Sequence, residues 1–307
     1  MDNLKHPLLS ICIPTYNHIE YLKNCLQYVI EASKAYEKEI EIIISDNCST
    51  DGTKEYISQL NIPNLKYYRN EINLGFNKNL FLLVDDYATG DFVWTIGDDD
   101  YISKDSIKLF IDNHENTDLL LLRYYITSQR DTDCKKNRVL CMHKASYFQA
   151  IDQIADYGNI LATFMTCAIF KKEKWNKLNK EKLQINNWLS FKEIFPNGYL
   201  LLQSFFDSKN VKYSEDMFIF IEPHEKDWDD KIRKIQFEIL PSFFYFIKRT
   251  YKGNKNLKKT KELIADQLIG NINNYNIINI ILKLFRLEIS PKYLYLKLYK
   301  KMSRHCK

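Results

Sequence analysis

Three consecutive carboxylates are the side chains of this sequence that could most directly support chemistry. Asp98, Asp99 and Asp100 follow Gly97 at the end of a short aromatic and β-branched run, residues 91–96, which predicts a buried β-strand. Adjacent like charges repel one another, and a hard divalent cation with oxygen ligands would offset that repulsion. The triplet therefore indicates a metal site at a strand end, with a solvated acidic turn as the alternative.

The period of a β-strand suggests how the triplet would be used. Successive strand residues point to opposite faces, so that positions i and i+2 share one face. If the extended conformation continues through the triplet, Asp98 and Asp100 lie on the same side. We expect this pair to form the acidic site.

The elements upstream of the triplet alternate between strand and helix. Apolar β-branched runs predict the strands, and apolar residues at helical spacing predict the helices. We expect strands at residues 8–14, 39–45, 65–68 and 91–96, and helices at residues 19–37, up to about 60, and 77–87. Short connections between alternating elements are typical of an α/β fold with a mostly parallel, doubly wound sheet and helices on both faces.

The loops that follow the predicted strands are all polar. They comprise residues 14–17, 46–51, 69–79 and 97–100. Parallel α/β sheets bind their ligands beyond the carboxyl ends of the strands. The convergence of four polar loops on that edge predicts a binding site there.

The order and spacing of these motifs resemble a known enzyme family. The sequence reads PTYN at 14–17, DNCSTDGT at 46–53, NLG at 73–75 with KN at 78–79, and GD at 90–91 leading into GDDD at 97–100. These motifs are similar to those of glycosyltransferase family 2, which has the GT-A fold. The resemblance is greatest to the branch that includes abequosyltransferases of bacterial O-antigen assembly, and it covers residues 8 to about 125.

The resemblance implies a nucleoside-diphosphate-sugar donor and a bound Mn²⁺ or Mg²⁺. It implies that Asp100 is a catalytic residue and direct metal ligand, and that Asp98 also lies at the metal and contacts the donor sugar or ribose. Many relatives have Asp in place of Gly97, so that the acidic pair could instead include Asp99. The donor-binding residues that it implies are Pro14, Thr15, Tyr16, Asn17, Asp46, Arg69, Lys78, Asp98 and Asp99.

Each implied role has a structural alternative. Asp46 could accept a hydrogen from the imide of uracil or the amine of guanine or cytosine, or it could form a turn. Tyr16 could stack on the base or pack beside its strand. Arg69 and Lys78 could meet the diphosphate or be solvated. Asp51 could be a ligand or stabilise a helix N-terminus.

Inverting transfer also needs a base that takes the proton of the acceptor hydroxyl. Family members commonly carry a Glu-Asp pair at the start of a helix that follows the acceptor region, after an apolar strand that we expect here at residues 163–170. The helix expected at 197–206 begins without an acid, so Glu193, just upstream, is the first candidate for the base. His224 resembles a late histidine that binds metal in some relatives, or it is structural. The alternative bases are Asp207, Glu215 and Asp216.

Length and composition predict a globular protein with a large core. The chain has 307 residues, of which 45% are hydrophobic and 14% aromatic. We expect a donor-binding half at residues 1–125, an acceptor-binding half at 126–238 and a basic, aromatic helical region at 239–307. Seven cysteines without CxxC spacing argue for reduced thiols. The sequence shows neither a signal peptide nor an apolar run long enough to span a bilayer, so we expect a cytoplasmic protein.

Charge is distributed unevenly along the chain. Residues 248–307 contain 15 Lys or Arg and 3 Asp or Glu, whereas residues 1–247 contain 29 and 36. The basic end could attach peripherally to an anionic membrane on its inner face, where a lipid-linked acceptor would lie, or it could form helices with solvated lysines. No nucleic-acid recognition motif accompanies the charge, and we expect no nucleic-acid partner.

The residues and the family resemblance together predict a metal-dependent glycosyltransferase, and the resemblance implies that it is inverting. It would move a sugar from a nucleoside-diphosphate-sugar to a hydroxyl of a growing bacterial surface glycan, whether O-antigen, lipooligosaccharide or capsule. Two alternatives remain. A nucleotidyltransferase also uses Gly-Asp-Asp, although in a hairpin between antiparallel strands, and the missing base suggests an inactive nucleotide-sugar-binding protein.

Overall fold

The computed structural model describes residues 6–126, 142–155, 165–178, 195–221, 239–251, 257–270, 280 and 283–284. Contacts divide the chain into two compact units. The first comprises residues 1–150 and 162–223, and the second comprises residues 151–161 and 224–307. The functional division expected at residues 125 and 238 stays a prediction.

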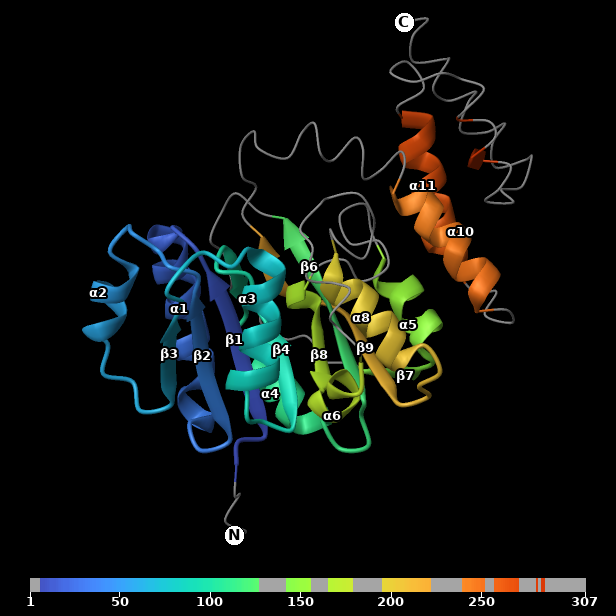
Figure 1. The fold of residues 1–307 in the computed structure, drawn as a ribbon. Helices are drawn as coiled ribbons and strands as arrows, with labels where there is room; N and C mark the ends of the chain where they lie inside the picture. The colour runs from blue at the N-terminus through green and yellow to red at the C-terminus, as the bar shows by residue number, and fades with distance from the viewer. Residues whose placement is uncertain are drawn as a thin grey trace, which may run out of the picture. The chain divides into compact units, whose positions relative to one another are not determined.

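The first unit begins with four parallel strands. They are β1 (Leu9–Thr15), β2 (Ile40–Asp46), β3 (Leu65–Arg69) and β4 (Phe92–Thr95), in the spatial order β3-β2-β1-β4. All four strands match predicted ones, because buried apolar runs bounded by polar loops are a strong local signal. Figure 1 shows them side by side, with α3 in front of them.

Helices cover both faces of these strands, as predicted. Helix α1 (Ile19–Ser33) continues into a 3₁₀ turn, η1 (Lys34–Tyr36), and α2 (Thr53–Ser58) is short. Helix α3 (Phe76–Leu82) ends in a π-helical turn, η2 (Leu83–Tyr87). The helical segments therefore agree with the predicted ranges to within a few residues.

The second half of the sheet is mixed. Strand β8 is antiparallel to β4 and β6, and β9 is parallel to β6 and antiparallel to β5 and β7, so that the order continues β4-β8-β6-β9-β5. The elements are β5 (Asp100–Ile102), α4 (Ser106–Asn113), β6 (Leu119–Ile126), β7 (His143–Ala145), α5 (Tyr147–Ile154), η4 (Met165–Cys167), β8 (Ala168–Lys171), α6 (Lys172–Asn176), α8 (Pro196–Phe205) and β9 (Val211–Ile221).

One predicted strand is shorter than expected. The apolar segment 163–170 reads as a continuous strand, but residues 165–167 form a 3₁₀ turn and β8 begins only at Ala168. Side chains at the end of β4 bond to the main chain of this segment. The Trp94 indole N–H donates to the carbonyl oxygen of Thr166 at 2.7 Å, and the Thr95 hydroxyl donates to the carbonyl oxygen of Met165 at 3.3 Å. These bonds take the place of a regular ladder.

The main core lies between the sheet and one layer of helices. Alternate residues of β1 and β2, such as Ile11 and Ile42, are fully buried in one cluster with α1 residues such as Leu26 and with residues of α4. The intervening residues, such as Cys12 and Ile43, are equally buried and point to the face covered by α3. Burial on both faces explains why these strands are almost continuously apolar.

Glu41 links the four parallel strands near their amino ends. Its buried carboxylate accepts hydrogen bonds from the Ser10 hydroxyl at 2.5 Å and from the N–H and hydroxyl of Thr89 at 2.6 and 2.9 Å, and from the Lys66 ammonium at 2.6 Å. Burial alone would raise the pKa of Glu41, but these donors outweigh it and lower the pKa below 4.5. The ionised form is therefore stabilised by folding.

We expect Glu41→Gln to lower the free energy of unfolding by about 2–3 kcal/mol at pH 7, because it removes a charged acceptor of several buried donors. Folding lowers the pKa of Glu41. The contribution of its carboxylate to stability is therefore fully present at pH values above the ordinary glutamate pKa, and it is lost as the pH falls through the folded-state pKa. Urea unfolding at pH 7 and pH 4 should show the difference between wild type and variant narrowing at the lower pH.

The exposed Glu31, which pairs with Lys34 on α1, offers a matched control. Glu31→Gln should change stability by less than about 0.5 kcal/mol. An equal loss for Glu41→Gln at both pH values would contradict an ionic role for Glu41.

The described residues of the second unit include two helices, α10 (Leu240–Thr250) and α11 (Lys258–Gly270). Asp152 caps the start of α11, because its carboxylate accepts the N–H groups of Lys259 and Thr260 at 3.2 and 2.7 Å. The two helices confirm the expected helical C-terminal region where it is described, while most of residues 271–307 lie outside the described residues. None of the described helices combines the length and apolar character needed to cross a bilayer.

Candidate active site

Main-chain hydrogen bonds bring the four polar loops together at the carboxyl edge of the sheet. The N–H of Asn47 donates to the carbonyl oxygen of Thr15 and the N–H of Asn70 to that of Asp46, both at 2.9 Å. The N–H of Ile96 continues the pairing of β4 with β1. The ladders therefore extend past the strand ends, and the loops are neighbours as predicted.

The acidic triplet lies in a tight turn. Strand β4 ends at Thr95, and the N–H of Asp100 donates to the carbonyl oxygen of Gly97 at 3.1 Å, which closes a β-turn with Asp98 and Asp99 at its centre. The expectation that Asp98 and Asp100 share a face through strand alternation does not hold, because that rule requires an extended backbone.

Asp98 contacts the loop that follows β1. Its side chain is largely buried; Oδ2 accepts the Thr15 hydroxyl at 2.6 Å, and Oδ1 lies 3.3 Å from His18 Nδ1. Burial raises the pKa of Asp98, although the bond from His18 opposes this, and Asp98 in turn raises the pKa of His18. Sequence reasoning missed His18, whose only signal is its place directly after the PTYN motif.

Asp100 contacts a segment far along the chain. It is 3% exposed, and its Oδ2 accepts the hydroxyl of Thr166, which itself accepts the N–H of Gly97 at 3.0 Å. Burial raises the pKa of Asp100 well above its usual range, and repulsion from Asp99 adds to this while the Thr166 hydroxyl acts in the opposite direction. Folding thus forces this carboxylate into a place that disfavours its charge.

Gly97 makes room for two carboxylates. A Cβ at this position would lie 2.8 Å from Asp99 Oδ1 and 2.8 Å from Asp100 Oδ2. Oxygens of two neighbouring side chains therefore converge beside the main chain of Gly97, and any larger residue would displace them. This favours the triplet itself, rather than position 97, as the source of the acidic pair.

The chemistry of these residues fits a hard divalent cation. Two buried carboxylates with raised pKa values and a third beside them would be stabilised by a cation with oxygen ligands. In the part of the chain that the structure describes, no three His, Cys, Asp or Glu side chains form a ready cluster for a metal. Mg²⁺ is often held by only one or two carboxylates together with substrate phosphates, so a partial protein shell agrees with such a site.

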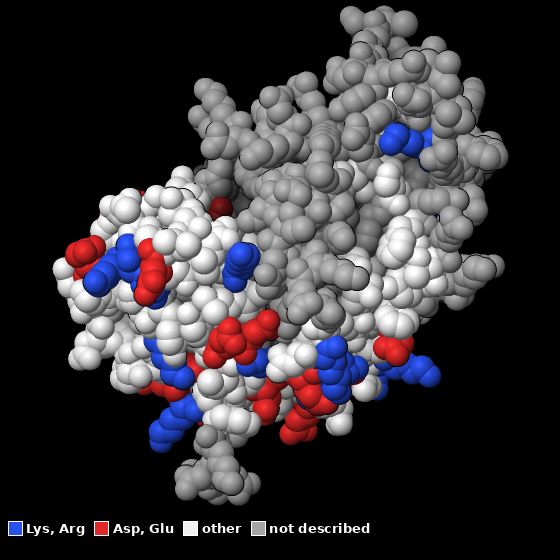
Figure 2. Space-filling model, viewed as in Figure 1, with Lys and Arg blue, Asp and Glu red and all other residues white. Residues whose placement is uncertain are grey.

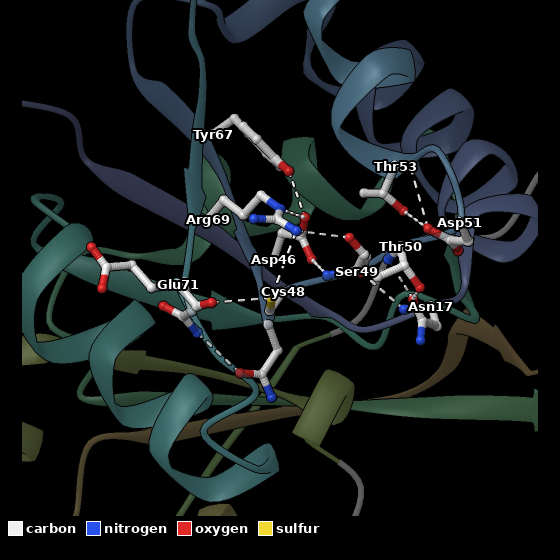
Figure 3. Close-up of polar contacts among 12 residues, drawn as sticks. Asn17, Asp46, Cys48, Ser49, Thr50, Asp51, Thr53, Tyr67, Arg69 and Glu71 are labelled. Atoms are coloured by element: carbon white, nitrogen blue, oxygen red, sulfur yellow. Dashed lines mark hydrogen bonds and ion pairs between the residues drawn. The ribbon is translucent and has the colours of Figure 1, made fainter.

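Asp46 is completely buried and already holds three donors (Figure 3). The N–H of Ser49 bonds to Oδ1 at 2.8 Å, the hydroxyl of Tyr67 bonds to Oδ2 at 2.5 Å, and Arg69 Nε lies 3.5 Å from Oδ2. Arg69 also donates to the carbonyl oxygen of Ser49 at 3.0 Å. In this structure Asp46 holds Arg69 at the rim, and its contact with a nucleotide base stays a prediction.

The loops after β1 and β2 are fastened to each other. The N–H of Asn17 donates to Ser49 Oγ at 2.9 Å, and Asn17 Oδ1 accepts the N–H of Thr50 at 2.8 Å. Asn17 and Cys48 have φ angles of +52° and +70°, a region that residues with a Cβ rarely adopt. The cross-links compensate for this backbone cost and hold both loops in one shape.

Asp51 accepts hydrogen bonds at the start of two helices, and Figure 3 shows its contact with Thr53 of α2. Its Oδ2 accepts the N–H of Ile19 at the start of α1 at 2.8 Å, and its Oδ1 accepts the hydroxyl and N–H of Thr53 at the start of α2, at 2.6 and 3.2 Å. Of the two roles expected for Asp51, the structure shows the one at helix N-termini.

A network of asparagines supports the loop after β3, and sequence reasoning missed it. Asn70 Nδ2 donates to the side-chain oxygens of Asn47 at 3.1 Å and Asn79 at 2.9 Å; Asn79 Nδ2 donates to the Ser45 carbonyl oxygen at 2.9 Å, and Asn47 Nδ2 donates to Asn73 Oδ1 at 2.8 Å. Its only sequence signal is the recurrence of Asn in three successive motifs. The amides fix loops that would otherwise depend on solvent.

The other predicted site residues differ in accessibility. Tyr16 is 43% exposed and Lys78 is exposed on α3, whereas Pro14 is buried in β1. The candidate base Glu193 and the candidate metal ligand His224 both lie outside the described residues.

A mostly parallel α/β sheet with polar loops and an acidic turn at its carboxyl edge is the arrangement of the GT-A fold. Comparison with known families agrees with this class. The model of the family described as Glycosyl transferase family 2 matches residues 10–178. Because this is more than half of the chain, the protein belongs to glycosyl transferase family 2, as its motifs predicted.

Two curated relatives show the range of this similarity. Abequosyltransferase RfbV of Salmonella typhimurium is 31% identical over 220 residues, which cover 64% of this chain and 61% of that protein. The poly(ribitol-phosphate) beta-N-acetylglucosaminyltransferase TarS of Staphylococcus aureus is 34% identical over 119 residues, which cover 37% of this chain and 20% of that protein. The chain thus matches less than two thirds of the length of either relative.

Solved structures confirm the fold. The structure of S. aureus TarS 1–349 in complex with UDP-GlcNAc has a TM-score of 0.55 and 17% identity and covers 86% of this chain and 72% of that one. The mannosyltransferase PcManGT from Pyrobaculum calidifontis, in complex with GDP-Man and Mn²⁺, has a TM-score of 0.52 and 13% identity and covers 96% of this chain and 84% of that one. At these identities the likeness concerns the fold alone.

We expect Asp100→Asn to lower the release of nucleoside diphosphate from the donor by on the order of 100-fold or more, because it removes the carboxylate charge predicted to bind the divalent cation that offsets the charge of the departing diphosphate. The melting temperature should stay the same or rise, since the variant removes a buried charge while the amide oxygen can still accept the Thr166 hydroxyl. A coupled assay and a thermal melt would measure both.

Asp112→Asn is a matched control, because Asp112 is half-exposed and pairs with Lys108 on α4. It should leave turnover unchanged. Near-normal turnover of Asp100→Asn would remove Asp100 from the site.

Proposed function

We propose that this protein is a metal-dependent, inverting glycosyltransferase. It moves a sugar from a nucleoside-diphosphate-sugar to a hydroxyl of a growing bacterial surface glycan, of the O-antigen, lipooligosaccharide or capsule class. The observation that carries the proposal is the buried acidic turn at Asp98–Asp100, at the meeting point of four polar loops, in a chain of glycosyl transferase family 2.

The donor half of the site has distinct parts. Asp100 is the direct metal ligand, and Asp98, held by Thr15 and His18, faces the donor sugar or ribose. A bound Mn²⁺ or Mg²⁺ supplies Lewis acidity that offsets the charge of the departing diphosphate. Arg69 and Lys78 provide positive charge at the rim for the same diphosphate.

The proposed acceptor site depends on a base that takes the proton of the attacking hydroxyl. Glu193 stays the proposed base. His224 stays a proposed additional metal ligand. Support for a glycan acceptor comes from the names of the relatives, an abequosyltransferase and a poly(ribitol-phosphate) glycosyltransferase.

The geometry argues against nucleotidyl transfer. In that chemistry a Gly-Asp-Asp turn joins two antiparallel strands that pair with each other. Here β4 pairs with β1 and β8, whereas β5, which follows the turn, pairs with β9. The turn therefore connects two separate positions in the sheet, which favours glycosyl transfer.

A thermal-shift panel tests the donor site. UDP, GDP, CDP and dTDP are each added with and without Mn²⁺, and a ligand at 100 times its dissociation constant adds about 2.7 kcal/mol of stability. We expect one nucleotide to raise the melting temperature by a few degrees, on the order of 2–4 °C, only when Mn²⁺ is present. The absence of any metal-dependent shift would contradict the proposed donor site.

The basic C-terminal region, with 15 Lys or Arg in residues 248–307, is proposed to attach peripherally to anionic lipid, near a lipid-linked acceptor. On the face seen in Figure 2, acidic and basic side chains are interspersed over the first unit, which gives that face no comparable basic surface. The full chain should co-sediment with phosphatidylglycerol vesicles at low salt and be released as salt screens the charges. Equal binding to neutral phosphatidylcholine vesicles, or no binding to either, would contradict this attachment.

A further inference from the structure

A single hydroxyl connects the acidic turn to a segment 66 residues further along the chain. Thr166 Oγ1 accepts the N–H of Gly97 at 3.0 Å and donates to Asp100 Oδ2. The bond to Gly97 reaches the first residue of the turn and the bond to Asp100 reaches the last. Thr166 therefore spans the turn that carries all three carboxylates.

The position of Thr166 is fixed by its surroundings. The residue is fully buried, and its carbonyl oxygen accepts the indole N–H of Trp94 at 2.7 Å. Two residues on, β8 pairs with β4 through Ile169 and Trp94. The backbone of Thr166 is thus held from both sides, and its hydroxyl has no freedom to follow a moving carboxylate.

The hydrogen-bond direction gives the hydroxyl one role toward Asp100. A threonine hydroxyl has one hydrogen to donate. Because Thr166 accepts from a main-chain N–H at Gly97, that hydrogen is directed to Asp100 Oδ2. One oxygen of Asp100 is therefore pinned, which stops rotation of the carboxylate about its last bond and sets the direction of Oδ1.

Asp98 also accepts a hydrogen bond from a buried threonine hydroxyl, that of Thr15. The Thr15 hydroxyl donates to Asp98 Oδ2 at 2.6 Å, and both Thr15 and Thr166 are buried. Thr15 belongs to the conspicuous PTYN motif after β1, whereas Thr166 lies in the 3₁₀ turn η4 and in none of the motifs quoted above. The two carboxylates proposed to serve the metal are thus each oriented by one threonine.

We propose that Thr166 is a positioning residue that orients the Asp100 carboxylate toward the divalent cation and the donor diphosphate. The inference rests on the proposed function, because it assumes that Asp100 is the metal ligand. Thr166 itself touches neither the donor nor the reacting atoms in this proposal. Its contribution is to hold the Asp100 carboxylate in one orientation through the bond to Oδ2.

The test compares three substitutions of nearly equal size. Thr166→Val keeps the shape and removes the hydroxyl, Thr166→Ser keeps the hydroxyl, and Thr95→Val is the matched control. Thr95 is also buried and bonds to the same segment, through the carbonyl oxygen of Met165 at 3.3 Å, but no contact between its hydroxyl and the carboxylates is seen among the described residues. The probe is Mn²⁺, titrated by electron paramagnetic resonance with whichever of UDP, GDP, CDP or dTDP stabilises the protein most.

We expect Thr166→Val to weaken Mn²⁺ binding by roughly 10-fold or more, the usual effect of removing a partner that orients a metal ligand. The Mn²⁺ concentration needed for half-maximal turnover should rise by a similar factor. Thr166→Ser should restore both values to within about 3-fold of wild type, and Thr95→Val should leave both unchanged. A few degrees of lower melting temperature for both valine variants would fit the loss of one buried hydrogen bond.

Each other result overturns the inference. Wild-type Mn²⁺ affinity in Thr166→Val shows that the hydroxyl does not position Asp100. An equal loss in Thr95→Val or in Thr166→Ser assigns Thr166 a purely structural role. If Thr166→Val fails to fold, Thr166→Ala is compared with Thr166→Ser in the same titration, and equal affinities reject the proposal. If the wild-type protein binds Mn²⁺ with none of the four nucleotides, the proposed function itself is rejected. This result is distinct from wild-type Mn²⁺ affinity in Thr166→Val, which rejects only the role of Thr166.

Discussion

Repulsion among three adjacent carboxylates is the constraint on which the carboxyl edge of the sheet depends. Asp98 and Asp100 are buried beside Asp99, and both have raised pKa values. Three features accommodate these carboxylates: hydroxyl groups that donate to Asp98 and Asp100, a tight turn, and a glycine that leaves room for the carboxylate oxygens. None of these removes the excess negative charge. A hard divalent cation would offset that charge, which is why the proposed function includes a bound metal.

A second buried carboxylate in the same sheet shows the contrast. Glu41 is as buried as Asp100, but the ammonium of Lys66 and several neutral donors surround it, and its pKa is lowered. Glu41 has its counter-ion inside the fold and serves stability. Among the described residues, Asp100 accepts from a hydroxyl and a main-chain donor beside two like charges, and burial followed by repulsion from Asp99 raises its pKa. The opposite pKa shifts of these two buried acids distinguish their surroundings more clearly than burial does, and they support the functional role proposed for Asp100.

Sequence patterns predicted the parts of this fold that depend on local or periodic signals. The four parallel strands and their helices follow from apolar runs and helical spacing, and the polar loops follow from strand direction. The same reasoning expected β8 to include residue 166, and it placed Asp98 and Asp100 on one face if the backbone stayed extended. Neither holds, because side-chain bonds between segments about 70 positions apart decide the backbone there. His18 and the asparagine network were missed for a related reason. Their partners are distant in sequence, and no periodicity links them.

The solvent exposure of the candidate site residues indicates which of them can be substituted without loss of stability. Asp46, the two threonines and three members of the asparagine network, Asn47, Asn70 and Asn79, are buried and hold loops to one another. We expect a change at any of them to cost stability. Tyr16 and Lys78 are exposed, and substitutions at such positions usually change stability by less than about 0.5 kcal/mol. A family can therefore keep one buried acidic turn and alter its rim at little cost. Under the proposed function, the buried turn would serve the step common to all donors, and the exposed rim would be where a choice among donors can be made without disturbing the fold.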